Sequence, residues 1–439
     1  MENADDAGRP AWPLALPKSA AEIAAIHSAR KRVAFARAQR SALLAPRLAG
    51  IDADRLDDPA MWRRIPLLTK EELRTLTTEA FYRDFCIAGF AEAVEFWRSG
   101  GVTGKPLFYP RSAEDMRYML GVSFRRIWPC IGAGAEDVLH VSFPMGIHPI
   151  GQLLPRSAEM EGMATVWAGA GTTTASHAQI ELIQSLRPTV VAAMPSYALH
   201  LANVAEAGGI DLRALGVRKL LVSAEPLTAA KRAKLERGWG AKVYNSFGMT
   251  EGAMTSVERD GVEGMVAFSD LFYLEVIDAK TGAPVAEGEE GALVMTPLWS
   301  NSITPFLRWF SGDIVTLKRQ PPSADPFSSL PLLHHALRTE GFSKVRGINI
   351  NHSEFEDAMF AEPAIADFRV EIVATEGVDA LRLLVETARG VEAESARRTL
   401  VDCVRRRFEM TPEIEVLESG SLAREFEKSI KAPRFVDKR

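Results

Sequence analysis

The stretch Phe96-Trp97-Arg98-Ser99-Gly100-Gly101-Val102-Thr103-Gly104-Lys105-Pro106-Leu107 holds three glycines, two hydroxyl side chains and one lysine between Ser99 and Lys105. Glycine lets backbone N–H groups turn toward an anion because no Cβ blocks the approach, and the hydroxyl and ammonium groups add further donors. This composition predicts a loop that binds phosphate. It is not a Walker A loop, because Pro106 stands where that motif needs serine or threonine for magnesium. A glycine-rich surface turn is the alternative for this stretch taken alone.

Length and composition narrow the class of protein. A chain of 439 residues is too long for one hydrophobic core and is expected to form two or three domains. A net charge of −5 argues against binding to nucleic acid or to an anionic membrane surface. We expect neither a signal peptide at the acidic N-terminus nor a membrane-spanning helix, since no apolar run reaches about 18 residues. The three cysteines are far apart and lack metal-ligand spacing, which indicates a reducing compartment and predicts a cytoplasmic protein.

From residue 137 onward, short apolar segments alternate with amphipathic ones. The expected strands are Val138–Phe143, Thr165–Trp167, Thr189–Met194, Lys219–Ser223 and Lys242–Tyr244. The expected helices between them are 177–186, 197–207 and 228–238. This alternation predicts a mainly parallel sheet covered by helices on both faces.

Polar and aromatic residues follow four of these strands. They occupy residues 143–148, 194–197, 223–226 and 244–251. Ligands of parallel sheets bind at the carboxyl ends of the strands, so these four segments predict a binding site there.

The remaining segments are predicted from their local patterns. We expect a helical segment over 18–48, a capping box from Thr69 to Glu72, and a helix over 113–128 that Pro129 ends. Residues 264–317 predict a β subdomain, and the Pro- and Ser-rich residues 319–331 predict a loop. His334 and His335 lack partners at metal-ligand spacing and are interpreted as loop residues, whereas His177 and His200 fall on helix faces. Strands over 367–374, 380–387 and 413–417 with a helix over 391–409 predict a small α+β domain, followed by a basic tail without a pattern.

Taken in order, the motifs of the chain resemble those of the adenylate-forming superfamily, and most closely the phenylacetate–CoA ligase family. Ser99–Pro106 is similar to the family's Ser-Ser-Gly-Thr-Thr-Gly-Lys-Pro loop, and Asn245–Glu251 matches Asn-x-Tyr-Gly-x-Thr-Glu. The other similar blocks are Pro144–Gly151, Ser223–Pro226, Thr281–Thr296, Arg308 with Gly312-Asp313, Lys344–Asn349 and Ile430–Arg439. The resemblance implies an α/β fold: a large N-terminal α/β domain with a β subdomain, and a small mobile α+β C-terminal domain. The expected bounds are 1–95 for a helical N-terminal part, 96–340 for the adenylate-forming core and 341–439 for the mobile domain.

The same resemblance implies a reaction. An ATP-dependent ligase would activate a carboxylic acid, aryl or arylacetic, to an acyl-adenylate and transfer the acyl group to CoA, releasing AMP and pyrophosphate. ATP, Mg²⁺ and CoA would be required, and a homodimer would be compatible with the family.

Site residues are carried over from the matching motifs. ATP or AMP would contact Ser99, Gly101, Thr103, Gly104, Lys105, Ala224, Glu225, Pro226, Asn245, Ser246, Phe247, Gly248, Arg308 and Asp313. Among these, Phe247 and Ala224 would enclose adenine, and Asp313 would accept both ribose hydroxyls. The catalytic residues would be Lys431, Thr250 and Glu251, the last of which would also hold Mg²⁺. The acyl pocket would be lined by Gly146, His148, Tyr197 and Met254. Lys344, Arg346 and Gly347 would serve the hinge and the CoA step.

Some positions differ from the family pattern, and they leave alternatives open. Ile430 replaces the glycine before the terminal lysine, Phe310 replaces a polar residue, and the usual hinge aspartate is missing. Lys428 could take the role of Lys431, although only Lys431 is followed by arginine three residues later. The alternatives to a CoA ligase are an adenylating enzyme that loads a carrier protein or an amine acceptor, and a homologue that binds nucleotide without turnover.

Overall fold

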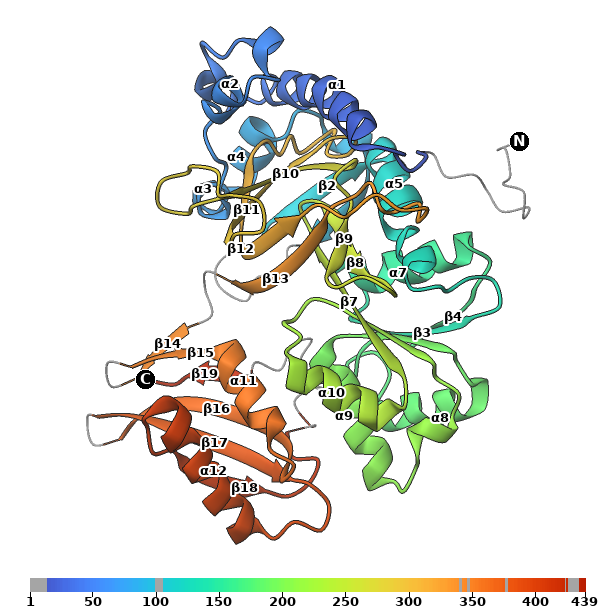
Figure 1. Cartoon of the computed structure of the whole chain (residues 1–439), viewed down its shortest axis with the longest axis vertical. Coiled ribbons are helices and arrows are strands. Elements are labelled where there is room, and N and C mark those ends of the chain that lie inside the picture. Colours follow the sequence, from blue (N-terminus) through green and yellow to red (C-terminus); the bar gives the residue numbers. More distant parts are fainter. Residues whose placement is uncertain are drawn as a thin grey trace. The chain divides into compact units, whose positions relative to one another are not determined.

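Figure 1 shows the computed structural model of the chain, which describes residues 14–98, 106–338, 342–345, 348–375, 378–422, 424 and 434–439. The chain forms two compact units. The first comprises Met1–Glu136, Gly146–Ala164 and Asn245–Thr339, and the second comprises Asp137–Met145, Thr165–Tyr244 and Glu340–Arg439. The predicted α/β class is confirmed, while the predicted domain bounds and the mobility of the last domain stay predictions.

Helices dominate the beginning of the first unit. They are α1 (Ala20–Ala38), α2 (Pro59–Arg63), α3 (Lys70–Thr75) and α4 (Thr78–Ala80). The predicted capping box is confirmed: the Thr69 side chain accepts the Glu72 N–H, and the Glu72 carboxylate accepts the Thr69 N–H. Short 3₁₀ or π turns occupy Ala45–Leu48, Ala53–Arg55, Phe81–Phe85 and Phe90–Glu92.

An antiparallel hairpin brackets the glycine-rich stretch. Strand β1 (Ala93–Arg98) pairs with β2 (Phe108–Ser112), and Arg98 lies opposite Phe108. The predicted phosphate loop itself, Ser99 to Lys105, lies outside the described residues.

The helix predicted over 113–128 is interrupted. The structure has α5 (Ala113–Tyr118), a π-helical segment at Met119–Phe124 and α6 (Ile127–Cys130). The prediction that Pro129 ends the helix is wrong, because Pro129 lies inside α6. It is the third residue of that helix, where a backbone N–H has no intrahelical partner, so proline removes no hydrogen bond. The last helix of this unit, α7 (Pro149–Met160), follows His148.

A largely antiparallel sheet forms the rest of the first unit. Its strands are β7 (Lys242–Met249), β8 (Ala253–Glu258), β9 (Met265–Ala267), β10 (Phe272–Ile277), β11 (Gly291–Pro297), β12 (Trp309–Lys318) and β13 (Leu332–Arg338), in the order β10-β11-β12-β13-β9-β8-β7. Met265, Ala267, Leu293, Val315 and Leu333 form its buried core. The strand-rich prediction for 264–317 is confirmed. The prediction that His334 and His335 are loop residues is wrong, because both lie on β13.

A parallel sheet forms the centre of the second unit. The strands β3 (Val138–Ser142), β4 (Ala164–Trp167), β5 (Val190–Ala193) and β6 (Lys219–Val222) take the order β6-β5-β3-β4, and β5 runs parallel to both β3 and β6. The helices are α8 (Ser176–Leu186), α9 (Pro195–Ala207) and α10 (Ala229–Trp239), with a 3₁₀ turn at Leu212–Ala214. All four residues of β5 are buried, as expected for a central parallel strand. The predicted strands and helices of this region are confirmed.

The C-terminal part of the second unit is an α+β arrangement. It contains β14 (Phe342–Val345), β15 (Ile348–Asn351), α11 (His352–Ala361), β16 (Ile365–Thr375), β17 (Val378–Thr387), α12 (Ala393–Phe408), β18 (Glu413–Leu417) and β19 (Phe435–Asp437). The sheet order is β18-β17-β16-β19. The predicted strands and helix over 367–417 are confirmed. Strand β19 was not predicted, since three residues are too few to show a periodicity.

Among the described residues, no helix combines the length and the apolar character needed to cross a membrane.

Candidate active site

The segment Asn245–Glu251 forms the end of β7 and the turn that leads into β8. A bulge interrupts the pairing between Phe247 and Gly248. A Cβ on Gly248 would lie 2.5 Å from the carbonyl oxygen of Ala253, and one on Gly252 would lie 2.5 Å from Cε of Met295. Glycine at both positions therefore lets this turn pack closely against its neighbours.

Glu251 is buried at the end of this turn, with 4% of its surface exposed. Its Oε1 accepts a hydrogen bond of 2.9 Å from the hydroxyl of Tyr109 on β2. The same oxygen lies 3.6 Å from Nζ of Lys70, at the first residue of α3. Burial, together with the nearby negative charge of Glu251, raises the pKa of Tyr109, so the phenol stays protonated and donates.

The carboxylate oxygens of Glu251 are ligands that suit a hard cation. Among the described residues, no cluster of three or more His, Cys, Asp or Glu side chains could enclose a metal ion. Mg²⁺ does not need such a cluster, because it binds through one or two carboxylates together with phosphate oxygens and water. The Glu251 carboxylate therefore fits a magnesium ion that arrives with a nucleotide.

A second group of side chains comes from three strands of the first unit. Asp313 on β12 is buried, and its Oδ1 lies 3.1 Å from Nε2 of His335 on β13. The His335 ring also contacts the ring of Phe247 on β7, with centroids 4.9 Å apart. His335 therefore contacts both Asp313 and Phe247, two residues of the predicted nucleotide site. The sequence analysis did not assign His335 to this site. Side chains alternate along a strand, so a pair of adjacent histidines sends one to each face, but this signal required β13 to be recognised.

Arg308 makes contacts that differ from those expected of a nucleotide ligand. Its guanidinium donates to Glu275 at 3.0 and 3.1 Å and to the backbone carbonyls of Arg63 and Ile65 at 3.1 and 2.7 Å. Arg308 is buried and has a positive φ of 45°. This side chain ties the beginning of β12 to the N-terminal helices, which assigns it a positioning role.

The predicted adenine segment follows β6 in the second unit. Ala224 has φ of 71°, a conformation that costs a residue with a Cβ about 1–3 kcal/mol and is common at functional turns. The Glu225 carboxylate accepts the N–H of Ser196 at 3.0 Å and its hydroxyl at 2.6 Å, which anchors the turn to the start of α9. Pro226 is exposed, and its carbonyl accepts a hydrogen bond of 3.3 Å from Nζ of Lys231.

Two further residues of the predicted nucleotide site lie on β7 in the first unit. The Asn245 N–H donates to the Glu258 carboxylate at 2.8 Å. Ser246 is buried and pairs with Val257 of β8.

Three of the four predicted acyl-pocket residues lie in the first unit. Gly146 has φ of 90° and its carbonyl accepts from the Gln152 side chain, while His148 is half-buried directly before α7. Met254 is buried on β8, and its carbonyl accepts the Ser123 hydroxyl. The fourth, Tyr197, lies in the core of the second unit.

Tyr197 belongs to a buried polar network. Its hydroxyl lies 3.0 Å from Oγ of Ser176 and accepts from Nε2 of Gln179 at 2.9 Å. Gln179 also contacts His140, and His200 lies 2.9 Å from Ser176. Burial lowers the pKa of His140 to about 4, so this imidazole is neutral at physiological pH.

Several predicted residues lie outside the described part of the chain. They are Ser99, Gly101, Thr103, Gly104, Lys105, Arg346, Gly347 and Lys431. Lys344 is described: it is exposed on β14, and its carbonyl accepts from Arg439 at 3.0 Å.

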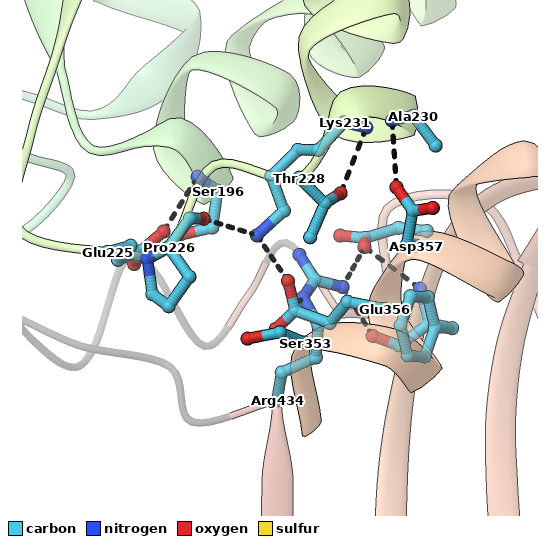
Figure 2. A network of polar contacts seen from close by, with 12 residues as sticks. Ser196, Glu225, Pro226, Thr228, Ala230, Lys231, Ser353, Glu356, Asp357 and Arg434 are labelled. Atoms are coloured by element: carbon cyan, nitrogen blue, oxygen red, sulfur yellow. Dashed lines mark hydrogen bonds and ion pairs between the residues drawn. The ribbon is translucent and has the colours of Figure 1, made fainter. Parts of the chain in front are cut away.

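Arg434, three residues after Lys431, is held firmly in the second unit (Figure 2). Its Nη1 donates to Asp367 at 2.5 Å and to the Phe368 carbonyl at 2.6 Å, and its Nε lies 3.9 Å from Glu356. Glu356 also forms an ion pair with Lys231 of α10, and the N–H of Ala230 donates to Asp357 at 2.9 Å. The residue that ends the predicted Lys-x-x-Arg motif is therefore tied to both α11 and β16.

Comparison with known proteins identifies the family. The family described as AMP-binding enzyme matches residues 99–297. The phenylacetate-coenzyme A ligase of Thermus thermophilus is 30% identical over 345 residues, which cover 77% of this chain and 75% of that protein. The chain belongs to the phenylacetate–CoA ligase family of AMP-binding enzymes. The Escherichia coli phenylacetate-coenzyme A ligase is 26% identical over 343 residues, which cover 77% of this chain and 76% of that protein.

Solved structures agree on the fold. The structure of 2-hydroxyisobutyryl-CoA ligase in the postadenylation state, in complex with R3-HIB-AMP, has a TM-score of 0.84 with 24% identity and covers 97% of this chain and 91% of that one. Membership of the phenylacetate–CoA ligase family makes this chain an AMP-forming acid–CoA ligase, which converts a carboxylic acid to an acyl-adenylate and then transfers the acyl group to CoA.

Proposed function

We propose that the acid activated by this ligase carries an aromatic ring, as an aryl or arylacetic acid. The observation that carries the proposal is the 30% identity, over three quarters of both chains, to a phenylacetate-coenzyme A ligase. Two further relatives with that name, from Aromatoleum evansii and Pseudomonas putida, are 29% and 27% identical. Gly146, His148 and Met254 are the residues that we propose for the acyl pocket, and Tyr197 stays a prediction for it.

We assign nucleotide binding to residues of β7, β12 and the turn after β6. Asp313, buried and in contact with His335, would accept the ribose hydroxyls. Phe247 and Ala224 would enclose adenine, with Asn245, Ser246, Glu225 and Pro226 around its edge. The loop containing Ser99, Gly101, Thr103, Gly104 and Lys105 would hold the β- and γ-phosphates.

The first half-reaction forms the acyl-adenylate. An oxygen of the substrate carboxylate attacks the α-phosphorus of ATP, and the bond to the bridging oxygen of pyrophosphate breaks. The protein contributes mainly by aligning two anions and compensating their charge. Lys431 would neutralise the carboxylate and α-phosphate, and Thr250 would contact phosphate. Mg²⁺, held by Glu251, would supply charge compensation for the phosphates.

The second half-reaction transfers the acyl group. The CoA thiol loses its proton, its sulfur attacks the acyl carbonyl carbon, and AMP leaves with the carboxylate–phosphate oxygen. We assign this step to the segment that contains Lys344, Arg346 and Gly347, after a movement of the C-terminal domain about a short hinge. A cytoplasmic location is supported by the three cysteines, which are all free and buried.

A panel of carboxylic acids tests the proposal. Pyrophosphate release and acyl-CoA formation are measured for benzoate-like, phenylacetate-like and long-chain fatty acids, each with and without CoA. We expect acyl-CoA from a ring-bearing acid. Preference for a C12 fatty acid would contradict the acid class. Adenylate formation with no transfer to CoA would favour a carrier-protein or amine acceptor, and no pyrophosphate release with any acid would favour a nucleotide-binding homologue without turnover.

A further inference from the structure

Strand β2 carries two side chains that contact the turn containing Glu251. Tyr109 and Arg111 are two residues apart on this strand, so both side chains face the same way. Both side chains are completely buried. Each makes contacts with the dipeptide Thr250–Glu251, although about 140 residues separate them in the sequence.

Arg111 holds the backbone of that dipeptide. Its Nη2 donates to the carbonyl oxygen of Thr250 at 2.6 Å. Its Nη1 donates to the Thr304 hydroxyl at 2.9 Å and to the side-chain oxygen of Asn301. The amide of Asn301 in turn donates to the carbonyl oxygen of Glu251 at 2.8 Å. Both backbone carbonyls of the dipeptide are therefore held by one connected network.

Tyr109 orients the side-chain carboxylate of Glu251. Both described contacts of the Glu251 carboxylate, the Tyr109 hydroxyl at 2.9 Å and the Lys70 ammonium at 3.6 Å, are made to Oε1. A carboxylate fixed through one oxygen presents the other in a defined direction. With respect to the described residues, this arrangement leaves Oε2 for a cation.

The positive charge of Arg111 is opposite in sign to the carboxylates beside it. Its three hydrogen-bond acceptors, namely the Thr250 carbonyl, the Thr304 hydroxyl and the Asn301 amide, are neutral. Burying a guanidinium against neutral acceptors is costly unless nearby negative charge compensates it. The nearby acids are Asp115 and Glu251, and their negative charges compensate part of the cost of burying the guanidinium of Arg111.

We propose that Tyr109 and Arg111 are positioning residues that set the Glu251 carboxylate for the magnesium ion accompanying ATP. The inference rests on the proposed role of Glu251. Neither residue contacts the reacting atoms: both act through Thr250 and Glu251.

The test compares two tyrosines that each lose one hydroxyl. Tyr109→Phe removes the hydrogen bond to Glu251, whereas Tyr82→Phe removes a hydrogen bond of 3.1 Å to the Phe108 carbonyl on the same strand and is the matched control. We expect Tyr109→Phe to raise the Mg²⁺ concentration for half-maximal pyrophosphate release about three- to tenfold, with the rate recovered at saturating Mg²⁺. Tyr82→Phe should leave that concentration unchanged. Arg111→Lys should shift it in the same direction as Tyr109→Phe.

A binding measurement separates this inference from the proposed function. The rise in melting temperature on adding ATP is measured with Mg²⁺ and with EDTA. We expect Tyr109→Phe to lose most of the Mg²⁺-dependent part of the rise and to keep acyl-CoA formation from a synthetic acyl-adenylate. An equal shift in both tyrosine variants, or equal loss of both half-reactions in Tyr109→Phe and Arg111→Lys, would overturn the inference. Wild-type protein that binds Mg²⁺ and ATP but releases no pyrophosphate with any acid would contradict the proposed function alone.

Discussion

Lys231 of α10 forms an ion pair with Glu356 of α11 inside the second unit (Figure 2). The Lys231 side chain is 2% exposed and that of Glu356 is 13% exposed. Arg434 approaches the other oxygen of the same carboxylate at 3.9 Å. One carboxylate is therefore shared between a helix of the α/β sheet and the arginine near the chain's end, which couples the position of α11 to that of Arg434.

Replacing Lys231 by methionine should destabilise the second unit. The change leaves the Glu356 carboxylate with one cation fewer in a largely buried place, and Arg434 compensates only in part. We expect a loss of about 1–3 kcal/mol in the free energy of unfolding, less than the loss when a buried charge is left without any partner. Urea unfolding, followed by far-UV circular dichroism, measures it.

The control is an exposed ion pair in the C-terminal part of the chain. Arg382 and Glu413 lie 3.4 Å apart with side chains 39% and 47% exposed. Arg382→Met should change the free energy of unfolding by no more than about 0.5 kcal/mol. The same loss in both variants would show that the Lys231–Glu356 pair contributes no more to the free energy of unfolding than an exposed ion pair does.

His335 should affect the use of ATP. It contacts Asp313 at 3.1 Å and the ring of Phe247, so His335→Ala removes a hydrogen bond to an ionised group and one wall beside Phe247. We expect the KM for ATP to rise about tenfold, with the KM for the acid little changed. Initial-rate kinetics with each substrate varied in turn measure this split. His334→Ala is the matched control, because the neighbouring side chain faces Gly264; a rise in both variants would contradict the assignment.

The buried His140 predicts a specific pH dependence of stability. Burial lowers its pKa to about 4, whereas an unfolded chain has the ordinary value of 6.5. Between these pH values the unfolded state binds a proton that the folded state does not bind, so the free energy of unfolding decreases as the pH falls from about 6.5 to about 4. The decrease due to His140 is about 3 kcal/mol. Unfolding of wild type and His140→Gln across this range isolates it: parallel pH curves would contradict the prediction.

The sequence predicted the α/β fold well where local patterns were long. Strands β3, β5 and β6 are apolar runs flanked by turn residues, and the family motifs fall at their ends, so the fold class and the family are confirmed. Shorter elements were not predicted. Strand β19 has three residues and pairs with β16, and Arg434 just before it donates to Asp367 and to the Phe368 carbonyl. No local pattern contains these contacts.

Contacts between residues far apart in the sequence were not predicted for the candidate site either. Motifs led to the prediction of Asp313 and Glu251 as site residues, but they do not contain the residues that contact these two side chains. His335 reaches Asp313 because β12 pairs with β13, and Tyr109 reaches Glu251 across 142 positions of sequence. For Arg308, the motif predicted a contact with the nucleotide, whereas in the structure its guanidinium donates to Glu275. Such long-range contacts follow from the tertiary fold.

The last prediction concerns the lysine of the first half-reaction. Arg434 is anchored by Asp367 and Glu356, and Lys431 precedes it by three residues in the sequence. Lys431→Ala should lower acyl-adenylate formation about 10²–10³-fold, the usual effect of removing one group that stabilises transition-state charge. Thioester formation from a synthetic acyl-adenylate should be spared, because that step needs no charge between a carboxylate and an α-phosphate. Both half-reactions are measured in Lys431→Ala and in Lys428→Ala, which is the matched control for charge in the same tail. Loss in Lys428→Ala instead would transfer the role to that lysine, and equal loss of both half-reactions in Lys431→Ala would show that its contribution is structural.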